Sequence, residues 1–178
     1  MIQLRAKHAT DRQVLAWAAD IRALTRDAGC LFFVNDRFDL ALAVGADGVH
    51  LGQEDLPPAL VPVEVRDRLM IGRSTHTGEQ ALASCGEPVD YVAFGPVFGT
   101  ESKQSAYSAR GPALLEEVVG FVRPRPVFAI GGVDEARCRE SVRVGAAGVA
   151  VISAVAAADD PERAVRRLVA ALRESGAS

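Results

Sequence analysis

Two aspartates that follow neighbouring apolar runs are the first residues whose type and spacing suggest chemistry. Asp36 comes shortly after the run 31–34, and Asp55 comes shortly after the run 48–51. If both runs are adjacent strands of a parallel sheet, the two carboxylates lie at the same edge of that sheet. Mg²⁺ could bridge them there, with water and a diphosphate as its remaining ligands. The alternative is that Asp36 and Asp55 each cap the helix that follows. Taken alone, the two residues favour the capping interpretation.

Polar and apolar residues alternate at the start of the chain. In a strand this alternation puts Gln3, Arg5 and Lys7 on one face. Burying two cations without a partner is costly, so the pattern predicts a bound anion. A frayed segment with solvated charges is an equally good interpretation. Lys7 is one of only two lysines in the chain, and Lys103 is the other.

Phosphate-binding groups are predicted in two further places. The long irregular stretch 95–111 carries Thr100, Ser102 and Lys103, and its length is typical of a lid or binding loop. Hydroxyls and an ammonium group suit phosphate oxygens.

The second place is the end of the last two predicted strands. Gly131 and Gly132 follow one strand, and Ile152 and Ser153 end the other. Paired glycines let backbone N–H groups approach a phosphate, and barrels of strands and helices commonly bind phosphate there. A plain Gly-Gly turn is the alternative, and the phosphate interpretation is favoured.

Three polar residues, Ser74, Thr75 and His76, follow the fourth apolar run. They either line a pocket or begin the next helix. His50 lies within a strand pattern and is interpreted as a core histidine. No Gly-x-Ser-x-Gly motif surrounds Ser74, so acyl transfer has no support.

The elements that must position these residues alternate along the chain. The predicted strands span residues 2–5, 31–35, 48–51, 70–74, 91–95, 127–130 and 148–152. The predicted helices span residues 11–27, 37–44, 59–68, 78–83, 111–122, 134–144 and 161–175. Nearly continuous apolar strands between helices are typical of a parallel α/β sheet.

Two helix-to-strand joints, 44–49 and 144–149, are similar and lie 100 residues apart. Such repetition favours a (β/α)8 TIM barrel, in which Gly45 and Gly145 end their helices in the left-handed conformation. A complete barrel has eight strand–helix pairs. Seven are predicted here, so we expect either that the first strand and helix are missing or that the sheet is open and doubly wound.

Composition narrows the class of protein. The chain has 178 residues, 49% of them hydrophobic and 24% charged, values typical of one globular domain that spans residues 1–178. The three cysteines form no C-x-x-C pair, which argues against a zinc site or a disulfide framework and favours a reducing compartment.

Charge and hydropathy predict the partners and the compartment. The formal net charge of −3 excludes the strongly basic surface that nucleic acid or an anionic membrane would need. The longest apolar runs fall short of the roughly 20 residues that span a bilayer, and no signal peptide is recognisable. We therefore expect a cytoplasmic protein whose partners are small molecules, and a homodimer remains open.

Seven stretches of the sequence resemble the thiamine-phosphate synthases, in the superfamily that also holds the thiazole tautomerases. They occur in the family's order and cover nearly the whole chain. The stretches are residues 3–7, 34–42, 44–55, 71–76, 90–98, 129–132 and 148–153. The resemblance implies a (β/α)8 barrel that joins hydroxymethylpyrimidine diphosphate to thiazole phosphate and releases diphosphate.

The resemblance also implies roles for single residues. It implies Mg²⁺ as cofactor, bound by Asp36 and Asp55. The implied diphosphate-binding residues are Arg5, Lys7, Asn35 and Lys103, and Gln3 and Ser74 would lie near the pyrimidine. The implied thiazole-phosphate contacts are Thr100, Ser102, Gly132, Ile152 and Ser153. Lys103, Ser74, Arg5 and Lys7 would carry the catalysis.

Two other functions remain as alternatives. Thiazole tautomerases use a histidine just after the glycine of the fifth strand, and this chain has Pro96 there. A non-catalytic protein that binds phosphorylated ligands is the second alternative. Both predicted metal aspartates and both lysines are present, which favours the synthase.

Overall fold

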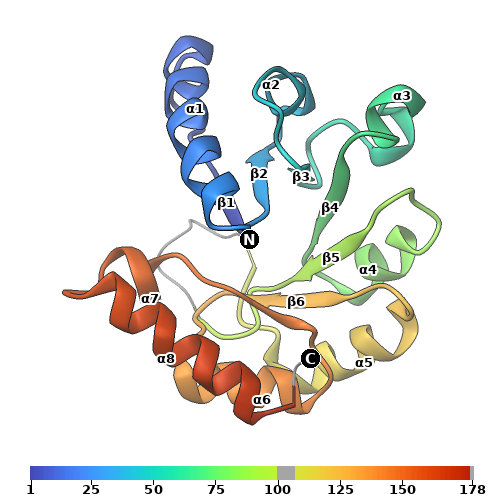
Figure 1. Cartoon of the computed structure of the whole chain (residues 1–178). Coiled ribbons are helices and arrows are strands. Elements are labelled where there is room, and N and C mark those ends of the chain that lie inside the picture. Colours follow the sequence, from blue (N-terminus) through green and yellow to red (C-terminus); the bar gives the residue numbers. More distant parts are fainter. Residues whose placement is uncertain (100–106, 177–178) are drawn as a thin grey trace. The chain divides into compact units, whose positions relative to one another are not determined.

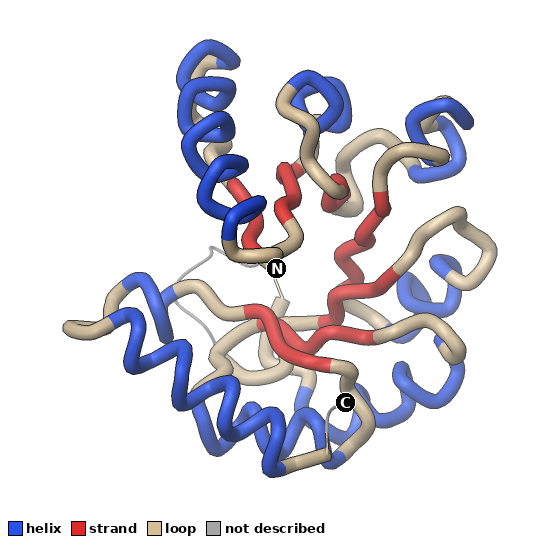
Figure 2. Tube along the Cα trace, in the orientation of Figure 1, coloured by secondary structure: helices blue, strands red, loops and turns tan. Residues whose placement is uncertain are grey.

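The computed structural model describes residues 1–99 and 107–176 (Figure 1). These residues form two compact units. The N-terminal unit comprises Met1–Arg73 with Glu87–Asp90, and the C-terminal unit comprises Ser74–Gly86 with Tyr91–Ser178. Helices and strands alternate along both units, as Figure 2 shows.

The strands of the N-terminal unit pair in parallel and in chain order. They are β1 (Ile2–Leu4), β2 (Phe32–Asn35), β3 (Gly48–Leu51) and β4 (Met70–Thr75), whose last two residues belong to the C-terminal unit. Its helices are α1 (Asp11–Asp27), α2 (Phe38–Ala43), the 3₁₀ turn η1 (Pro58–Leu60) and α3 (Val63–Arg66). Phe32, Val49 and Leu51 are fully buried, because parallel strands present apolar side chains on both faces.

Two local features shape this unit. Thr10 and Gln13 form a capping box at the start of α1, which satisfies backbone donors that the first turn leaves free. At Gly48, a Cβ atom would lie 2.3 Å from the Phe33 ring. Glycine is therefore needed where β3 passes this aromatic side chain.

The C-terminal unit repeats the strand–helix alternation. Its strands β5 (Tyr91–Phe94), β6 (Val127–Ile130) and β7 (Gly148–Ala150) pair in parallel and in chain order. Its helices are α4 (Gly78–Ser84), α5 (Gly111–Val122), α6 (Glu135–Arg143), α7 (Ser153–Ala156) and α8 (Pro161–Glu174). The helices α6 and α8 pack together, with Cys138 and Leu168 in the core between them.

The predicted α/β order of elements is confirmed, and all seven predicted strands lie in the described residues. Gly45 and Gly145 have φ angles of 63° and 97°, which confirms that they end their helices in the left-handed region. The prediction of an eighth strand–helix pair and a closed barrel stays a prediction. Among the described residues, no helix combines the length and the apolar character that crossing a bilayer requires.

The predicted helix 59–68 was wrong as a continuous element. The structure has the turn η1 and the short helix α3 there, with Pro62 between them. Proline lacks the N–H that a helix interior needs and disfavours helical backbone before it, so the two pieces stay separate. The short helix α7 was not predicted, and β7 ends at Ala150 rather than continuing to Ile152.

Candidate functional site

The N-terminal unit brings Asp36, Asp55 and Lys7 together. The carboxyl groups of Asp36 and Asp55 lie within hydrogen-bonding reach of each other, and Lys7 Nζ lies 3.2 Å from Asp36 Oδ2. Burial raises the pKa of Asp36 above its ordinary value, and the neighbouring Asp55 raises that pKa further, while Lys7 opposes the shift. The two aspartates therefore lie near enough to interact, and their role as metal ligands stays a prediction.

Backbone conformation places Asp36 in this cluster. Its φ angle is 67°, in the left-handed region, and its N–H donates to the His50 carbonyl oxygen at 2.8 Å. Aspartate adopts this conformation more readily than most residues. The last residue of β2, Asn35, is paired in register with His50.

Glycine at position 52 lets Asp55 fold back on the chain. The Gly52 N–H donates to Asp55 Oδ2 at 2.6 Å, and a Cβ atom at Gly52 would lie 2.9 Å from that oxygen. The capping interpretation of both aspartates was wrong. Arg37 is the N-cap of α2 and Pro57 is the N-cap of η1, and neither helix start has a side-chain cap.

The sequence left open whether the first polar residues are buried or solvated, and in the structure they are solvated. Gln3, Arg5 and Lys7 are exposed. The pairing of β1 with β2 ends at Leu4, so the strand alternation on which the prediction depended does not reach Arg5 or Lys7. Lys7 instead meets Asp36 from a turn that follows the strand.

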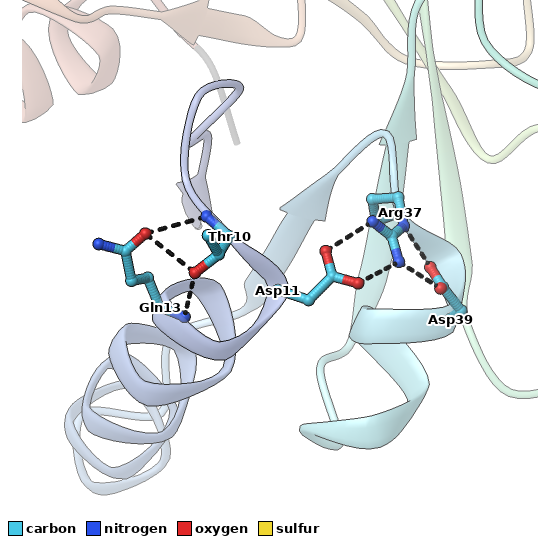
Figure 3. Close-up of polar contacts among 5 residues, drawn as sticks. All are labelled: Thr10, Asp11, Gln13, Arg37 and Asp39. Carbon is cyan, nitrogen blue, oxygen red and sulfur yellow. Dashed lines mark hydrogen bonds and ion pairs between the residues drawn. The ribbon is translucent and has the colours of Figure 1, made fainter.

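Sequence reasoning missed Arg37, which joins the starts of two helices (Figure 3). Its guanidinium donates to both carboxylate oxygens of Asp11 at 2.9 and 3.1 Å and to both of Asp39 at 2.8 and 2.6 Å. These contacts raise the pKa of Arg37, and Arg37 holds the pKa of Asp39 below its ordinary value. The only sequence signal was an arginine directly after Asp36.

A pocket in the C-terminal unit contains four of the predicted site residues. Ser74, Gly132, Ile152 and Ser153 all line it. They come from β4 and from the segments that follow β6 and β7. The structure therefore brings together, within this unit, residues that the sequence places almost 80 positions apart.

The glycine pair of this pocket lies against the segment that follows β5. Gly131 and Gly132 have φ angles of 98° and 65°. A Cβ atom at Gly132 would lie 2.2 Å from the Gly99 carbonyl oxygen, and one at Gly131 would lie 2.6 Å from Pro96 Cα. Only glycine fits both the conformation and the space.

His76 also lines the pocket, and the sequence had left its role open. Thr77 caps α4, so His76 does not belong to the helix. Its Nδ1 lies 2.5 Å from the Gly95 carbonyl oxygen, and its ring stacks on Tyr107 with centroids 4.5 Å apart. His50 is only 7% exposed within β3, which confirms its interpretation as a core histidine.

The predicted residues Thr100, Ser102 and Lys103 lie outside the described residues, so their roles stay predictions. Within residues 1–99 and 107–176, no group of three or more His, Cys, Asp or Glu side chains could hold a metal ion. The pair Asp36 and Asp55 nevertheless fits Mg²⁺, which usually takes one or two carboxylates from protein. A cation there would oppose the burial and the neighbouring Asp55 that raise the Asp36 pKa.

Comparison with known proteins points to one family. The sequence profile described as thiamine monophosphate synthase matches residues 1–155. A thiamine-phosphate synthase of Chlorobium limicola is 44% identical over 98% of this chain and 83% of its own. One from Archaeoglobus fulgidus is 46% identical over 97% of this chain and 80% of its own.

The solved structures agree with these sequences. A thiamine phosphate pyrophosphorylase from Pyrococcus furiosus superposes with a TM-score of 0.90 and 39% identity, over 98% of this chain and 83% of that chain. An orotidine 5'-phosphate decarboxylase from Pyrococcus horikoshii superposes with a TM-score of 0.66 at 13% identity. The second likeness shows a shared fold alone.

Proposed function

The chain belongs to the thiamine monophosphate synthase family, and we propose on this basis that it joins hydroxymethylpyrimidine diphosphate to thiazole phosphate, giving thiamine phosphate and diphosphate. The family profile covers most of the chain, and relatives with this name match nearly all of it. The observation in the structure that carries the proposal is the contact between Asp36 and Asp55 beside Lys7.

The diphosphate is assigned to the N-terminal unit. Asp36 and Asp55 would hold Mg²⁺, which supplies positive charge to the leaving diphosphate when it is bound. Lys7 already lies 3.2 Å from Asp36 and is exposed, so its ammonium group can turn to a phosphate oxygen. The roles of Arg5, Asn35 and Lys103 in diphosphate binding rest on the family resemblance.

The thiazole phosphate is assigned to the pocket of the C-terminal unit. Gly132, Ile152 and Ser153 line this pocket, and backbone N–H groups at a glycine pair suit phosphate binding. Thr100 and Ser102 complete the proposed phosphate contacts. Ser74, on the wall of the same pocket, and Gln3 are assigned to the pyrimidine by resemblance.

The proposed reaction needs no nucleophile from the protein. The bond between the pyrimidine methylene carbon and the diphosphate oxygen breaks, and both of its electrons leave with the diphosphate. Arg5, Lys7 and Lys103 stabilise the charge that grows on that oxygen. The pyrimidine amino group stabilises the methylene cation, and the thiazole nitrogen then forms the new carbon–nitrogen bond.

The family also supports a finer statement of the fold. We propose that the seven strand–helix pairs of this chain belong to a fold of the (β/α)8 barrel type. A cytoplasmic location with small-molecule partners is part of the same proposal.

The proposed activity is tested with both phosphorylated substrates and Mg²⁺. Chromatography should detect thiamine phosphate and diphosphate in equal amounts. Asp36→Asn and Asp55→Asn should each lower the rate at least tenfold, about 1.4 kcal/mol in activation free energy. Asp20→Asn is the matched control, because Asp20 is exposed on α1 and carries the same charge.

Two outcomes contradict the synthase proposal. Isomerisation of a thiazole phosphate without coupling to the pyrimidine would indicate a tautomerase, although this chain has the buried Pro96 where that family has a histidine. Binding of both ligands without any product would indicate a non-catalytic binding protein.

A further inference from the structure

A buried arginine contacts Gly52, the residue that hydrogen-bonds to Asp55 of the Asp36–Asp55 pair. Arg73, in β4, is only 6% exposed. Its Nη1 donates to the Gly52 carbonyl oxygen at 2.5 Å, and its Nε lies 3.2 Å from Glu87 Oε2. All of these residues belong to the N-terminal unit.

Residues 52–55 form a turn, and the Gly52 carbonyl oxygen accepts the hydrogen bond that closes it. The Asp55 N–H donates to this oxygen at 3.4 Å, and the Gly52 N–H donates to Asp55 Oδ2 at 2.6 Å. The turn is thus closed by the backbone and by the carboxylate itself. Arg73 fastens the closed turn to β4 through the same oxygen that receives the Asp55 N–H.

Stability alone is a poor explanation for this arginine. A buried cation loses much hydration energy, and replacing a buried ion pair with apolar side chains is often neutral or stabilising. The partner Glu87 is itself 23% exposed, so water weakens the attraction. What the guanidinium supplies is direction, because its planar group donates from Nη1 to the Gly52 carbonyl oxygen while its Nε side faces the Glu87 carboxylate.

We propose that Arg73 is a positioning residue for Asp55. By holding the Gly52 carbonyl oxygen it keeps the turn closed and keeps the Asp55 carboxyl group within reach of Asp36. Arg73 thereby sets the affinity of this pair for a divalent cation without touching the cation. The inference rests on the proposed function, which assigns Asp36 and Asp55 to Mg²⁺.

Residues that orient metal ligands typically change metal affinity by about 10 to 100-fold when they are removed. In Arg73→Met the Gly52 carbonyl oxygen loses its side-chain donor and the turn gains freedom. The Asp55 carboxylate then spends part of its time away from Asp36. We expect the dissociation constant for a divalent cation to rise at least tenfold.

The experiment measures Mn²⁺ binding to the full chain without substrates, by electron paramagnetic resonance, beside the melting temperature. Arg22→Met is the matched control. Arg22 has a side chain 19% exposed and pairs with Asp47 at 2.8 Å in the same unit. A purely structural role predicts that both variants melt earlier and bind Mn²⁺ equally well. The positioning role predicts weaker binding in Arg73→Met only.

Arg73→Lys keeps the test decisive if Arg73→Met does not fold. Lysine keeps the positive charge near Glu87 but lacks the planar guanidinium whose Nη1 donates to the Gly52 carbonyl oxygen. We expect Arg73→Lys to fold and to bind Mn²⁺ at least threefold more weakly. Unchanged binding in Arg73→Lys overturns the inference.

Failure of the inference and failure of the proposed function give different results. If Asp55→Asn loses Mn²⁺ binding while Arg73→Met retains it, the metal site stands and the role of Arg73 is wrong. If Asp36→Asn and Asp55→Asn bind Mn²⁺ as tightly as the unaltered chain, the proposed metal site is wrong and the inference falls with it.

Discussion

Gly132 combines a left-handed backbone with a close approach of two chain segments. Its φ angle is 65°, and a Cβ atom there would lie 2.2 Å from the Gly99 carbonyl oxygen. Gly132→Ala should therefore lower the free energy of unfolding by about 1 to 3 kcal/mol. It should also weaken binding of inorganic phosphate to the pocket. Urea denaturation and calorimetric titration measure the two effects.

Gly120 is the control for this substitution. It lies in α5, is exposed and has open space where a Cβ atom would stand. Gly120→Ala should raise the free energy of unfolding by about 0.5 to 1 kcal/mol, because alanine is the better helix former. If Gly132→Ala is as stable as the unaltered chain, the backbone at Gly99 moves to make room for the added Cβ atom. The close contact between Gly132 and Gly99 then does not require glycine.

Lys103 is the residue whose role depends most on the resemblance, since it lies outside the described residues. If its ammonium group stabilises the departing diphosphate, Lys103→Ala should lower kcat at least tenfold, about 1.4 kcal/mol. The melting temperature should stay within experimental error. Unchanged kcat would assign Lys103 to a solvated part of the loop.

At the scale of elements, Arg37 connects the first turns of α1 and α2 through Asp11 and Asp39 (Figure 3). Arg37 lowers the pKa of Asp39 in the folded chain. Asp39 therefore stabilises the fold above its ordinary pKa, and this contribution is lost as pH falls through the lowered value. The carboxylate is about half exposed, so the effect is small and sensitive to salt.

Asp39→Asn tests this connection. At neutral pH and low salt the variant should melt below the unaltered chain, and the difference should vanish in acid below the lowered pKa of Asp39. Melting curves recorded from neutral to acidic pH give the comparison. A repeat at high salt is the control, because screening should reduce the difference. A difference that persists in acid would show that lost packing, and not charge, is responsible.

At the scale of the whole molecule, the two proposed ligands are assigned to different compact units. Mg²⁺ with diphosphate should slow hydrogen exchange in the N-terminal unit, at the amides of Asp36 and Gly52. Thiazole phosphate should slow exchange in the C-terminal unit, around Gly131 and Gly132. At about 100 times its dissociation constant a ligand stabilises the folded state by about 2.7 kcal/mol.

Exchange measured peptide by peptide, with sodium chloride at equal ionic strength as the control, separates the two assignments. If both ligands protect the same peptides of a single unit, the division of the ligands between the units is wrong.

The order of strands and helices was predictable because short-range features decide it. Apolar runs bounded by glycine and proline define the strands. Glycine at a helix-to-strand joint ends the helix, as Gly45 and Gly145 do here. Errors arose where a local rule was overlooked, as at Pro62, or where strand pairing stopped early, as after Leu4. The first error joined two separate elements into one helix, and the second extended a strand by one residue past its last pairing.

The sequence by itself determined which residues stand at strand ends, and so which side chains were candidates for chemistry. Tertiary structure decided between alternatives that the residues left open, and at the aspartates it overturned the interpretation that they favoured. Asp36 and Asp55 are 19 positions apart, and only the folded turn at Gly52 shows that they contact rather than cap helices. Arg73 looked like any strand residue until its burial and its contact with Gly52 were known. Such contacts depend on how distant segments close on one another, which local propensity does not encode.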